Sequence, residues 1–328
     1  MQGAIRTKKI RSGKRISRKA SSNLFVLSVV WYPLVLFLIF WVGVNFNSIL
    51  LAFQSVNVDG SRQFVGFDNF VAFCKNAFSM QGSGTQLMYS FRNSLIKYAV
   101  SVVVCMPLYL IFSYQIYKKC FLHETIRAIS MVPSIISGYV ISLLFVNFIQ
   151  VGGPLYYVMS KTGHEWFSLL YPTINGKSPW IALATSIIYT IWLSFSTNLL
   201  VYPNAMNSIS PDIRDAAKID GVNNGFTDLR YIVLPLIFPT IETFLITGLS
   251  GIFMDVGPLI EFYYLSAPDY ASYVGYYYQV QVLTGNVSQY GLLAAGGLIL
   301  TAITAPLVFL LKWCCDKFGP STDAGGDK

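Results

Sequence analysis

Few side chains in this chain have the types and spacing that an enzyme active site requires. The 328 residues include two histidines, His123 and His164. A zinc-protease helix needs a second histidine four residues after the first, but Ser168 stands four residues after His164. The sequence also has no motif that would present a nucleophile beside a histidine. We therefore expect a protein that is not an enzyme and that holds no metal ion.

The short motif NGKS, Asn175–Ser178, is similar to the end of a phosphate-binding P-loop. A P-loop needs a glycine five residues before Gly176, and Tyr171 stands there instead. The five cysteines likewise lack the spacing of a metal site. We expect the chain itself to bind neither ATP nor another cofactor.

The best-formed polar segment, 203–235, lies between two long apolar runs and contains SPDIRDAAKIDGVNNGFTDLRYIVLP; we call it the elbow. Ser210 is a favourable N-cap, and Pro211 suits the first position of a helix. Gly221 is placed to end that helix in a left-handed conformation. A second short helix is expected at about Phe226–Val233. The elbow is therefore predicted to be a helix, a glycine turn and a second helix.

The first helix of the elbow is expected to present a smooth face. Asp212 and Asp215 lie in its first turns, where the helix dipole favours negative charge. Ile213, Ala216 and Ala217 share one face at helical spacing, and their small side chains would let another protein approach closely. The same face could instead rest on lipid headgroups as an amphipathic helix.

The composition around the elbow is that of a membrane protein. The chain is 54% hydrophobic and 12% charged, whereas a soluble domain carries about 25% charged residues. A helix needs roughly 20 apolar residues to cross a bilayer, and runs of that length exclude barrel strands. We predict an all-α integral membrane protein with six transmembrane helices, at about 24–53, 95–117, 128–149, 181–202, 236–254 and 292–313.

Charge sets the expected orientation of these spans. Of the 23 lysine and arginine residues, 17 lie in the N-terminal arm, in the segments after the second and fourth spans, and in the chain from the end of the last span onward. Because basic residues prefer the cytoplasmic side, both termini and the elbow are predicted to be cytoplasmic. The chain then divides into a basic cytoplasmic arm (1–23), a transmembrane domain (24–313) and a cytoplasmic tail (314–328). The arm explains most of the net charge of +8 as an anchor to anionic lipid, so no nucleic-acid partner is expected.

Ionisable and aromatic residues near the ends of the spans are candidates for a substrate pathway. Asp255 ends the predicted fifth span, and ionisable groups at membrane depth often serve function. Tyr263 and Tyr264 follow it in a segment rich in tyrosine. Aromatic faces and carboxylates would suit a carbohydrate, but tyrosines also gather at the membrane interface or against a partner protein. Both interpretations stay open.

The elbow resembles the EAA loop of the permease subunits of binding-protein-dependent ABC importers. The family pattern is Glu-Ala-Ala, three residues, Gly, nine residues, Ile, one residue and Leu-Pro. The matching residues here are Asp215, Ala216, Ala217, Gly221, Ile232, Leu234 and Pro235. The chain departs from the pattern twice. Its acidic residue is aspartate, and ten residues rather than nine separate Gly221 from Ile232, so the second helix is either shifted or preceded by a bulged turn. The resemblance implies that these residues couple the chain to a cytoplasmic ATPase.

Three shorter segments are similar to the sugar-importer branch of that family, which includes permeases for maltose, glycerol phosphate and multiple sugars. They are FVGFDNFVAF after the first span, FRNSLIKY at the entry to the second, and YGLLAAGGLIL at the start of the last. The resemblance covers most of Leu24–Trp313 and leaves out the basic arm and the polar tail.

The resemblance implies a membrane-spanning subunit of an ATP-driven importer in the cell membrane, which forms half of the pathway for a carbohydrate. Its implied partners are two cytoplasmic ATPase subunits that bind ATP and Mg²⁺, a second permease subunit, expected to be a different chain, and an extracytoplasmic solute-binding protein. One alternative is an importer permease for glycerol phosphate, an amino acid or a peptide. Another is a secondary transporter driven by an ion gradient. That class would need buried charged pairs and inverted repeats with broken helices, and the sequence shows neither clearly.

Overall fold

The computed structural model describes residues 18–57, 59–79, 83–162, 180–222, 224–285 and 287–320. The NGKS motif, His164, most of the basic arm and the end of the polar tail lie outside these described residues. The chain forms two compact units, Met1–Leu51 and Ala52–Lys328.

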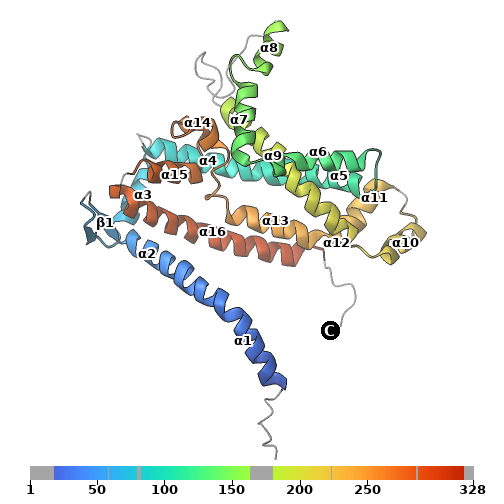
Figure 1. Ribbon diagram of the computed structural model, residues 1–328, viewed down its shortest axis with the longest axis horizontal. Coiled ribbons are helices and arrows are strands. Elements are labelled where there is room, and N and C mark those ends of the chain that lie inside the picture. Colours follow the sequence, from blue (N-terminus) through green and yellow to red (C-terminus); the bar gives the residue numbers. More distant parts are fainter. Residues whose placement is uncertain are drawn as a thin grey trace, which may run out of the picture. The chain divides into compact units, whose positions relative to one another are not determined.

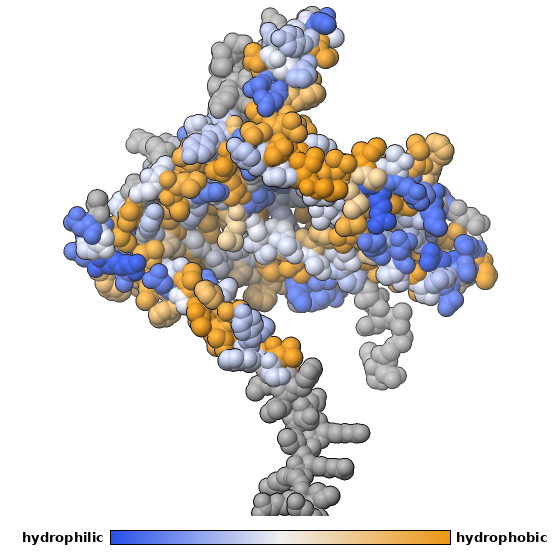
Figure 2. All heavy atoms as spheres, in the orientation of Figure 1, coloured by the Kyte–Doolittle hydropathy of each residue, from blue (hydrophilic) through white to orange (hydrophobic). Residues whose placement is uncertain are grey.

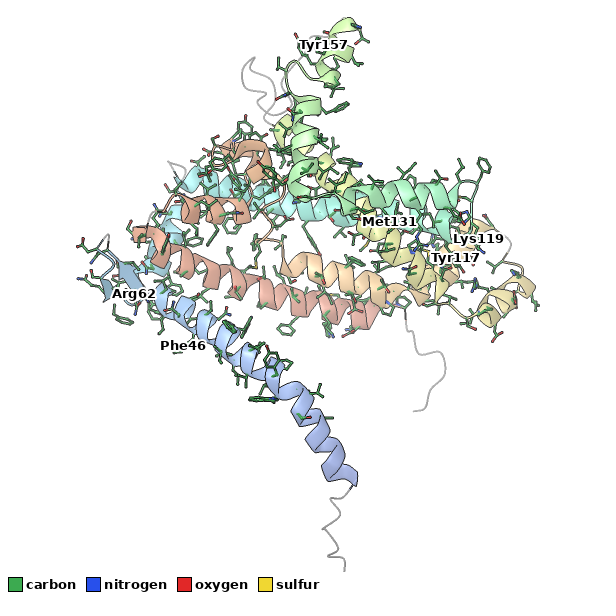
Figure 3. The ribbon with its side chains drawn as sticks, viewed as in Figure 1. Phe46, Arg62, Tyr117, Lys119, Met131 and Tyr157 are labelled. Atoms are coloured by element: carbon green, nitrogen blue, oxygen red, sulfur yellow. The ribbon has the colours of Figure 1, made fainter. Side chains whose placement is uncertain are left out.

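The described part of the first unit is one long apolar helix. It consists of α1 (Arg18–Leu36), the π-helical segment η1 (Phe37–Val42) and α2 (Gly43–Ala52). The stretch Ser28–Ala52 is long and apolar enough to cross a membrane. Large apolar side chains, Phe46 among them, are exposed along its length (Figure 3). A helix that is apolar all round belongs in lipid, in line with the predicted first span.

The second unit begins with a small hairpin that the all-α prediction did not include. Strand β1 (Gln54–Val56) pairs antiparallel with β2 (Arg62–Phe64), and Ser55 lies opposite Gln63. The helical elements before the elbow are α3 (Asp68–Phe78), α4 (Ser83–Val100), η2 (Ser101–Cys105), α5 (Met106–Tyr117), α6 (His123–Ile135), α7 (Gly138–Ile149), α8 (Pro154–Lys161) and α9 (Trp180–Asn207).

The elbow and the remaining chain are also helical. The elbow contains α10 (Pro211–Ile219), α11 (Gly225–Asp228), η4 (Leu229–Val233) and the start of α12 (Leu234–Leu236). After it come α13 (Phe238–Ser250), α14 (Leu259–Tyr263), η5 (Asp269–Ala271), α15 (Val274–Leu283), η6 (Val287–Gln289) and α16 (Tyr290–Phe318). Figure 1 shows that α13 lies along α16 and that α10 and α11 sit at one end of this unit, here called the elbow end.

The predicted all-α membrane fold is confirmed. Within the described residues, five helices are long and apolar enough to cross a membrane, or six when one bent pair is counted as a single span. The bent pair joins Gly225–Leu236 to Phe238–Ser250 at an angle of 68°, in the region of the predicted fifth span, 236–254. Pro239 explains the bend, because proline lacks an N–H and its ring collides with the carbonyl four residues earlier.

Two predicted spans differ from the helices that the structure contains. The predicted third span, 128–149, falls on two helices, because Ile136 and Ser137 adopt extended backbone between α6 and α7. Pro133 in α6 removes a helical hydrogen bond just before this break. The predicted second span, 95–117, is the inner part of a longer helical stretch that begins at Gly84.

Three apolar clusters hold the second unit together, and one of them joins α3, α4, α15 and α16 through Phe73, Leu87, Tyr277 and Leu293. Near the elbow end, Tyr109, Tyr114, Tyr202, Met206 and Val233 join α5, α9 and η4. Near the opposite end, another cluster joins α7, α9, α14 and α15 through Ile141, Leu183, Leu259, Tyr273 and Tyr276. Figure 2 shows apolar side chains over α6 and hydrophilic side chains around α10 and α11. This distribution fits a bundle in lipid with the elbow in water.

Candidate functional site

The first candidate site is the elbow, whose local structure follows its sequence. The Ser210 hydroxyl accepts a hydrogen bond from the Asp212 N–H at 3.3 Å and caps α10. Gly221 has a φ of +85°, a conformation that glycine adopts freely and other residues resist. Asn224 caps α11 by accepting a hydrogen bond from the Phe226 N–H at 3.2 Å. The predicted helix, glycine turn and second helix are therefore present.

The second half of the elbow contains a π-helical turn, η4. A π turn carries i→i+5 hydrogen bonds and so holds one residue more than an α turn. The elbow also has one residue more than the family pattern between Gly221 and Ile232. The wide turn accommodates that residue, and Val233 next to Ile232 remains buried in the apolar cluster at the elbow end. Leu234 and Pro235 then begin α12.

Helix α10 projects from the second unit with no buried residue. Asp215 is exposed, and its Oδ1 lies 2.8 Å from Lys218 Nζ. The hydrogen bond from Lys218 lowers the pKa of the Asp215 carboxyl, so this group is ionised at neutral pH. An exposed ion pair of this kind is worth little, and a basic side chain of a partner protein could replace Lys218.

The apolar residues of α10 do not form one equivalent face. Ala216 is exposed, as are Ile213 and Ile219. Ala217 is half-buried and lines a cavity of about 460 Å³ between α10 and the end of α5. Ala216 and its exposed neighbours are therefore free to meet another surface, whereas Ala217 faces the protein.

The C-terminal end of α5 makes polar contacts with both halves of the elbow. The Tyr114 hydroxyl donates to Asp228 Oδ2 at 2.7 Å, and Lys118 Nζ lies 2.6 Å from the same oxygen. Arg214 donates to the Ile209 carbonyl at 3.0 Å, and its guanidinium carbon lies 5.7 Å from the centre of the Tyr117 ring. We call these side chains the junction: Tyr114, Tyr117, Lys118, Arg214 and Asp228.

Nothing in the sequence predicted the junction. Tyr114 and Asp228 are 114 residues apart, and no motif links them. Figure 3 shows Tyr117 and Lys119 close together at this end of the molecule. The sequence places Lys118 directly after a predicted span and Asp228 in the predicted second helix of the elbow. These positions alone do not predict that the two residues are in contact.

The second candidate site is a groove made of three adjoining cavities along α4, α5, α9 and α13, lined by both polar and apolar side chains. Their volumes are about 460, 180 and 250 Å³. The first two share Lys97, Thr190, Ser194 and Asp255, and the last two share Tyr98, Ser101, Tyr109, Ser194 and Gly248. The groove therefore runs from the end that carries α14 toward the elbow end.

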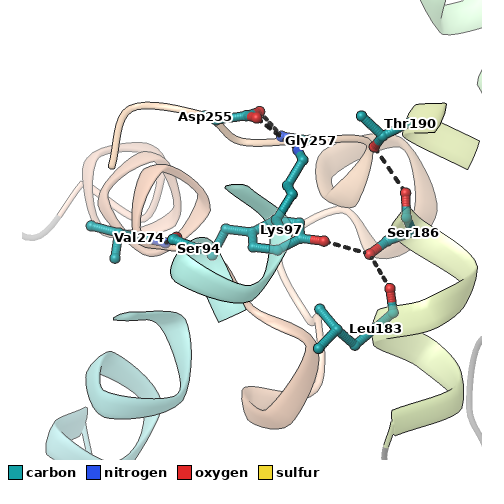
Figure 4. A network of polar contacts seen from close by, with 9 residues as sticks. Ser94, Lys97, Leu183, Ser186, Thr190, Asp255, Gly257 and Val274 are labelled. Carbon is teal, nitrogen blue, oxygen red and sulfur yellow. Dashed lines mark hydrogen bonds and ion pairs between the residues drawn. The ribbon is translucent and has the colours of Figure 1, made fainter. Parts of the chain in front are cut away.

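A charged pair stands where the first two cavities meet. Lys97 Nζ lies 2.7 Å from Asp255 Oδ2, and the lysine side chain is 11% exposed whereas the aspartate is 50% exposed. Asp255 Oδ1 accepts a hydrogen bond from the Gly257 N–H at 2.8 Å. Lys97 Nζ also lies 4.7 Å from the centre of the Tyr273 ring. Figure 4 shows this pair between the Ser94 region of α4 and the Ser186–Thr190 turn of α9.

The segment FRNSLIKY holds the chain that follows Asp255. Asn93 is fully buried, and its side-chain amide donates to the carbonyls of Tyr270 at 2.8 Å and Ser272 at 2.9 Å. The Ser94 hydroxyl accepts a hydrogen bond from the Val274 N–H at 3.2 Å. Helix α4 begins well before residue 95, the predicted start of the second span. It can do so because the polar side chains of Asn93 and Ser94 form hydrogen bonds within the protein.

The tyrosines predicted for the substrate pathway lie away from the groove. Tyr263 is 3% exposed and packs in the apolar cluster with Leu259 and Tyr276. Tyr264 is 70% exposed and has a φ of +56°. Among the described residues that line the three cavities, the tyrosines are Tyr98, Tyr109, Tyr189, Tyr202 and Tyr273. Asp255 is thus the one predicted pathway residue that reaches the groove.

The sequence of the second unit matches a known protein family. Residues 110–322 match the family described as binding-protein-dependent transport system inner membrane component. The sn-glycerol-3-phosphate transport system permease protein UgpA of Shigella dysenteriae serotype 1 (strain Sd197) is 24% identical over 251 residues, which cover 74% of this chain and 79% of that protein. UgpA of Salmonella typhimurium (strain LT2) is 24% identical over 250 residues, with the same coverage.

Solved structures share the fold. A chain of a bacterial alginate ABC transporter, in complex with an alginate pentasaccharide-bound periplasmic protein, superposes with a TM-score of 0.72 and 21% sequence identity. The match covers 94% of this chain and 99% of that chain. A second crystal structure, of a bacterial ABC transporter involved in the import of the acidic polysaccharide alginate, also gives a TM-score of 0.72, with 92% and 98% coverage.

Proposed function

Because this chain belongs to the family of binding-protein-dependent transport system inner membrane components, we propose that it imports an uncharged carbohydrate through the groove. Family membership makes the chain a permease subunit of an ABC importer, a multi-pass inner-membrane protein that is not itself the ATPase. A secondary transporter driven by an ion gradient is therefore excluded.

The observation that carries the substrate proposal is the charge balance of the groove. Among its described lining residues, Lys97 is the one cation, and Asp255 neutralises it at 2.7 Å. Glu261 adds a second carboxylate to the largest cavity. A negative charge on the substrate that came within about 5 Å of one of these carboxylates would be repelled by about 3 kcal/mol at an effective dielectric constant of 20. A phosphate or a uronate would meet that repulsion, whereas an uncharged carbohydrate would not.

The polar atoms of the groove suit hydroxyl groups. The Tyr98 hydroxyl donates to the carbonyl of Leu245 at 3.1 Å, so its oxygen remains available as an acceptor. Glu261 Oε2 is buried with no hydrogen-bond donor among the described residues. A buried acceptor without a donor is costly, and a hydroxyl of a bound carbohydrate would satisfy it.

The relatives support the substrate class only in part. UgpA is named for glycerol phosphate, and the alginate transporter is named for an acidic polysaccharide. Both substrates are anions. The groove described above has no unpaired cation for an anion, and this difference favours a neutral member of the carbohydrate class.

The elbow supports an ATP-driven mechanism with several partners. We propose that α10 docks on one of two cytoplasmic ATPase subunits, which bind ATP and Mg²⁺, and that Asp215, Ala216, Ala217, Gly221, Ile232, Leu234 and Pro235 form or shape the docking element. A second permease subunit would complete the pathway, as the resemblance to importer permeases implies. An extracytoplasmic binding protein would deliver the carbohydrate, with both termini and the elbow in the cytoplasm.

The proposal is tested by purifying the transporter with its binding protein and identifying the small molecule that the binding protein releases on denaturation. Mass spectrometry should find an uncharged mono- or oligosaccharide, and uptake of that compound into proteoliposomes should require MgATP and the ATPase subunits. A phosphorylated compound, an amino acid or a peptide would overturn the substrate class. Uptake that proceeds without ATPase subunits would overturn the proposed coupling.

A further inference from the structure

The parts of the elbow that lie farthest from the bundle have no apolar anchor. None of the residues of α10 or α11 is buried. After Gly221, the half-buried Leu229 packs against the apolar cluster at the elbow end, and Val233 is the first fully buried residue, at 1% exposure. Between Ile209 and Leu229, which both pack in that cluster, the polar contacts at the junction tie α10 and α11 to the bundle.

The junction concentrates these ties on one carboxylate. Asp228 Oδ2 receives both the Tyr114 hydroxyl at 2.7 Å and the Lys118 ammonium at 2.6 Å. The Asp228 side chain is 13% exposed, and Tyr114 is 6% exposed. Hydrogen bonds to an ionised group are shorter and stronger than neutral ones, and they strengthen where water is excluded.

Helix α5 connects this carboxylate to the groove. Tyr114 lies in α5 and Lys118 directly follows it, while Tyr109 of the same helix lines two of the three groove cavities. A continuous helix moves as a rigid element, because each turn is hydrogen-bonded to the next. Displacement of Asp228 would therefore move Tyr109 as well.

We propose that Asp228 is a positioning residue that ties the elbow to α5, so that movement of α10 by the ATPase is transmitted to the helix that lines the groove. The proposal rests on the proposed function, because it assumes an ATPase at α10. Arg214 is the companion tie, since it joins α10 itself to the Ile209 carbonyl and to the ring of Tyr117. Loss of Asp228 should leave the ATPase attached and active while the groove no longer responds to it.

The test uses the reconstituted complex of both permeases with the ATPase subunits, and its probe is MgATP with orthovanadate, which traps the ATPase. A reporter cysteine, Thr190→Cys, stands in the groove of a chain whose five native cysteines are replaced by alanine. Its labelling by a membrane-impermeant maleimide added outside is measured before and after trapping. In the complex with the native elbow, trapping should increase the labelling rate.

Three variants of the junction are compared with a matched control. Asp228→Asn removes the charge and keeps the shape, while Tyr114→Phe and Lys118→Met each remove one partner. Asp220→Asn removes one negative charge from an exposed residue of the same elbow and should behave as the native chain. Asp228→Asn should lower the trapping-induced increase in labelling about tenfold, within the range expected for coupling between two sites. The amount of trapped nucleotide and of attached ATPase should not change.

The single-partner variants should each lower the increase by less, and Asp228→Glu should restore part of it. If Asp228→Asn does not fold and insert in the membrane, Tyr114→Phe and Lys118→Met decide, because each preserves the carboxylate. The proposal would be overturned if trapping increased the labelling of Asp228→Asn as much as it increases that of Asp220→Asn. Where Asp228→Asn does not fold and insert, the same result in both single-partner variants would overturn it. Loss of attached ATPase would also overturn it, since Asp228 would then serve docking. If the native complex itself shows no increase on trapping, the proposed function fails instead.

Discussion

The Lys97–Asp255 pair makes an asymmetric prediction, because its two members differ in exposure. Asp255→Asn would leave an ammonium that is 11% exposed without its counter-charge, whereas Lys97→Met would leave a carboxylate that is 50% exposed. Water can solvate the carboxylate, and the Gly257 N–H still donates to it. The two substitutions should therefore differ in their effect on stability.

The magnitudes follow from burial. Removing one partner of a fully buried ion pair costs about 3–5 kcal/mol, and half-exposure of Asp255 reduces this to about 2 kcal/mol for Asp255→Asn. The contact of Lys97 with the Tyr273 ring, at 4.7 Å, offsets part of that cost. Lys97→Met should cost about 0.5 kcal/mol, as for a partly exposed pair. The double variant should be close to Lys97→Met, because no uncompensated ammonium remains.

Transport should follow a different order from stability. If hydroxyl groups of the substrate bind the carboxylate, Asp255→Asn and the double variant should each lower uptake about tenfold, which corresponds to about 1.4 kcal/mol for one hydrogen bond to a charged group. Lys97→Met should retain most of the uptake. Attachment of the ATPase should be unchanged in all three variants.

Thermal unfolding of the purified complex measures the effect of each variant on stability, and uptake into proteoliposomes measures its effect on transport. Equal losses of stability in the two single variants would refute the role assigned to burial. Full uptake by Asp255→Asn would remove this carboxylate from the substrate pathway. Loss of uptake in Lys97→Met at native stability would show that the cation, rather than the carboxylate, contacts the substrate.

Three further predictions test other parts of the account. On intact cells a membrane-impermeant thiol reagent should label Cys74, which is exposed, but not Cys314; labelling of Cys314 from outside would reverse the topology. Asn93→Ala should lower the free energy of unfolding by about 2 kcal/mol, because two buried carbonyls lose their donor, and an unchanged melting temperature would contradict this. Lys218 lowers the pKa of Asp215. Their pairing therefore stabilises α10 at pH values above the ordinary pKa of aspartate, and this stabilisation is lost as the pH falls through the lowered pKa. Lys218→Gln should raise the pKa of Asp215 in a carboxyl-carbon NMR titration, and an unchanged pKa would show that the pair does not persist in solution.

The elbow could be predicted from sequence because its determinants are local. The cap at Ser210, the proline at the first helical position and the positive φ of Gly221 each depend on neighbouring residues. The extra residue before Ile232 was visible in the sequence, but its consequence was not, since a shifted helix and a bulged turn were equally compatible with it. The structure contains a π turn there.

The groove could be predicted only in part, because its partners come from distant segments. Asp255 stood out as an ionisable residue at the end of a span, but nothing in the sequence paired it with Lys97. Tyr263 and Tyr264 were chosen for their residue type, and residue type does not distinguish a ring in an apolar cluster from a ring in a cavity. The break between α6 and α7 was also hidden, because Ile136 continues the apolar pattern on both sides.

The central claim is that the elbow couples this permease to an ATPase. Gly221→Val tests it through the backbone, because a Cβ at Gly221 meets no atom within 4 Å, and the cost comes from the positive φ that a β-branched residue resists. Gly221→Asn is the matched control, since asparagine tolerates this conformation. Asp215→Lys and Ala216→Trp test the exposed side of α10 by charge and by bulk.

The most direct measurement is the ATP hydrolysis of the reconstituted complex with and without its substrate-loaded binding protein, together with the amount of ATPase that copurifies. Gly221→Val, Asp215→Lys and Ala216→Trp should each lose attached ATPase or its stimulation by the binding protein, while Gly221→Asn retains both and all four variants still insert in the membrane. Full attachment and full stimulation in the first three variants would contradict the claim that the elbow is the coupling element.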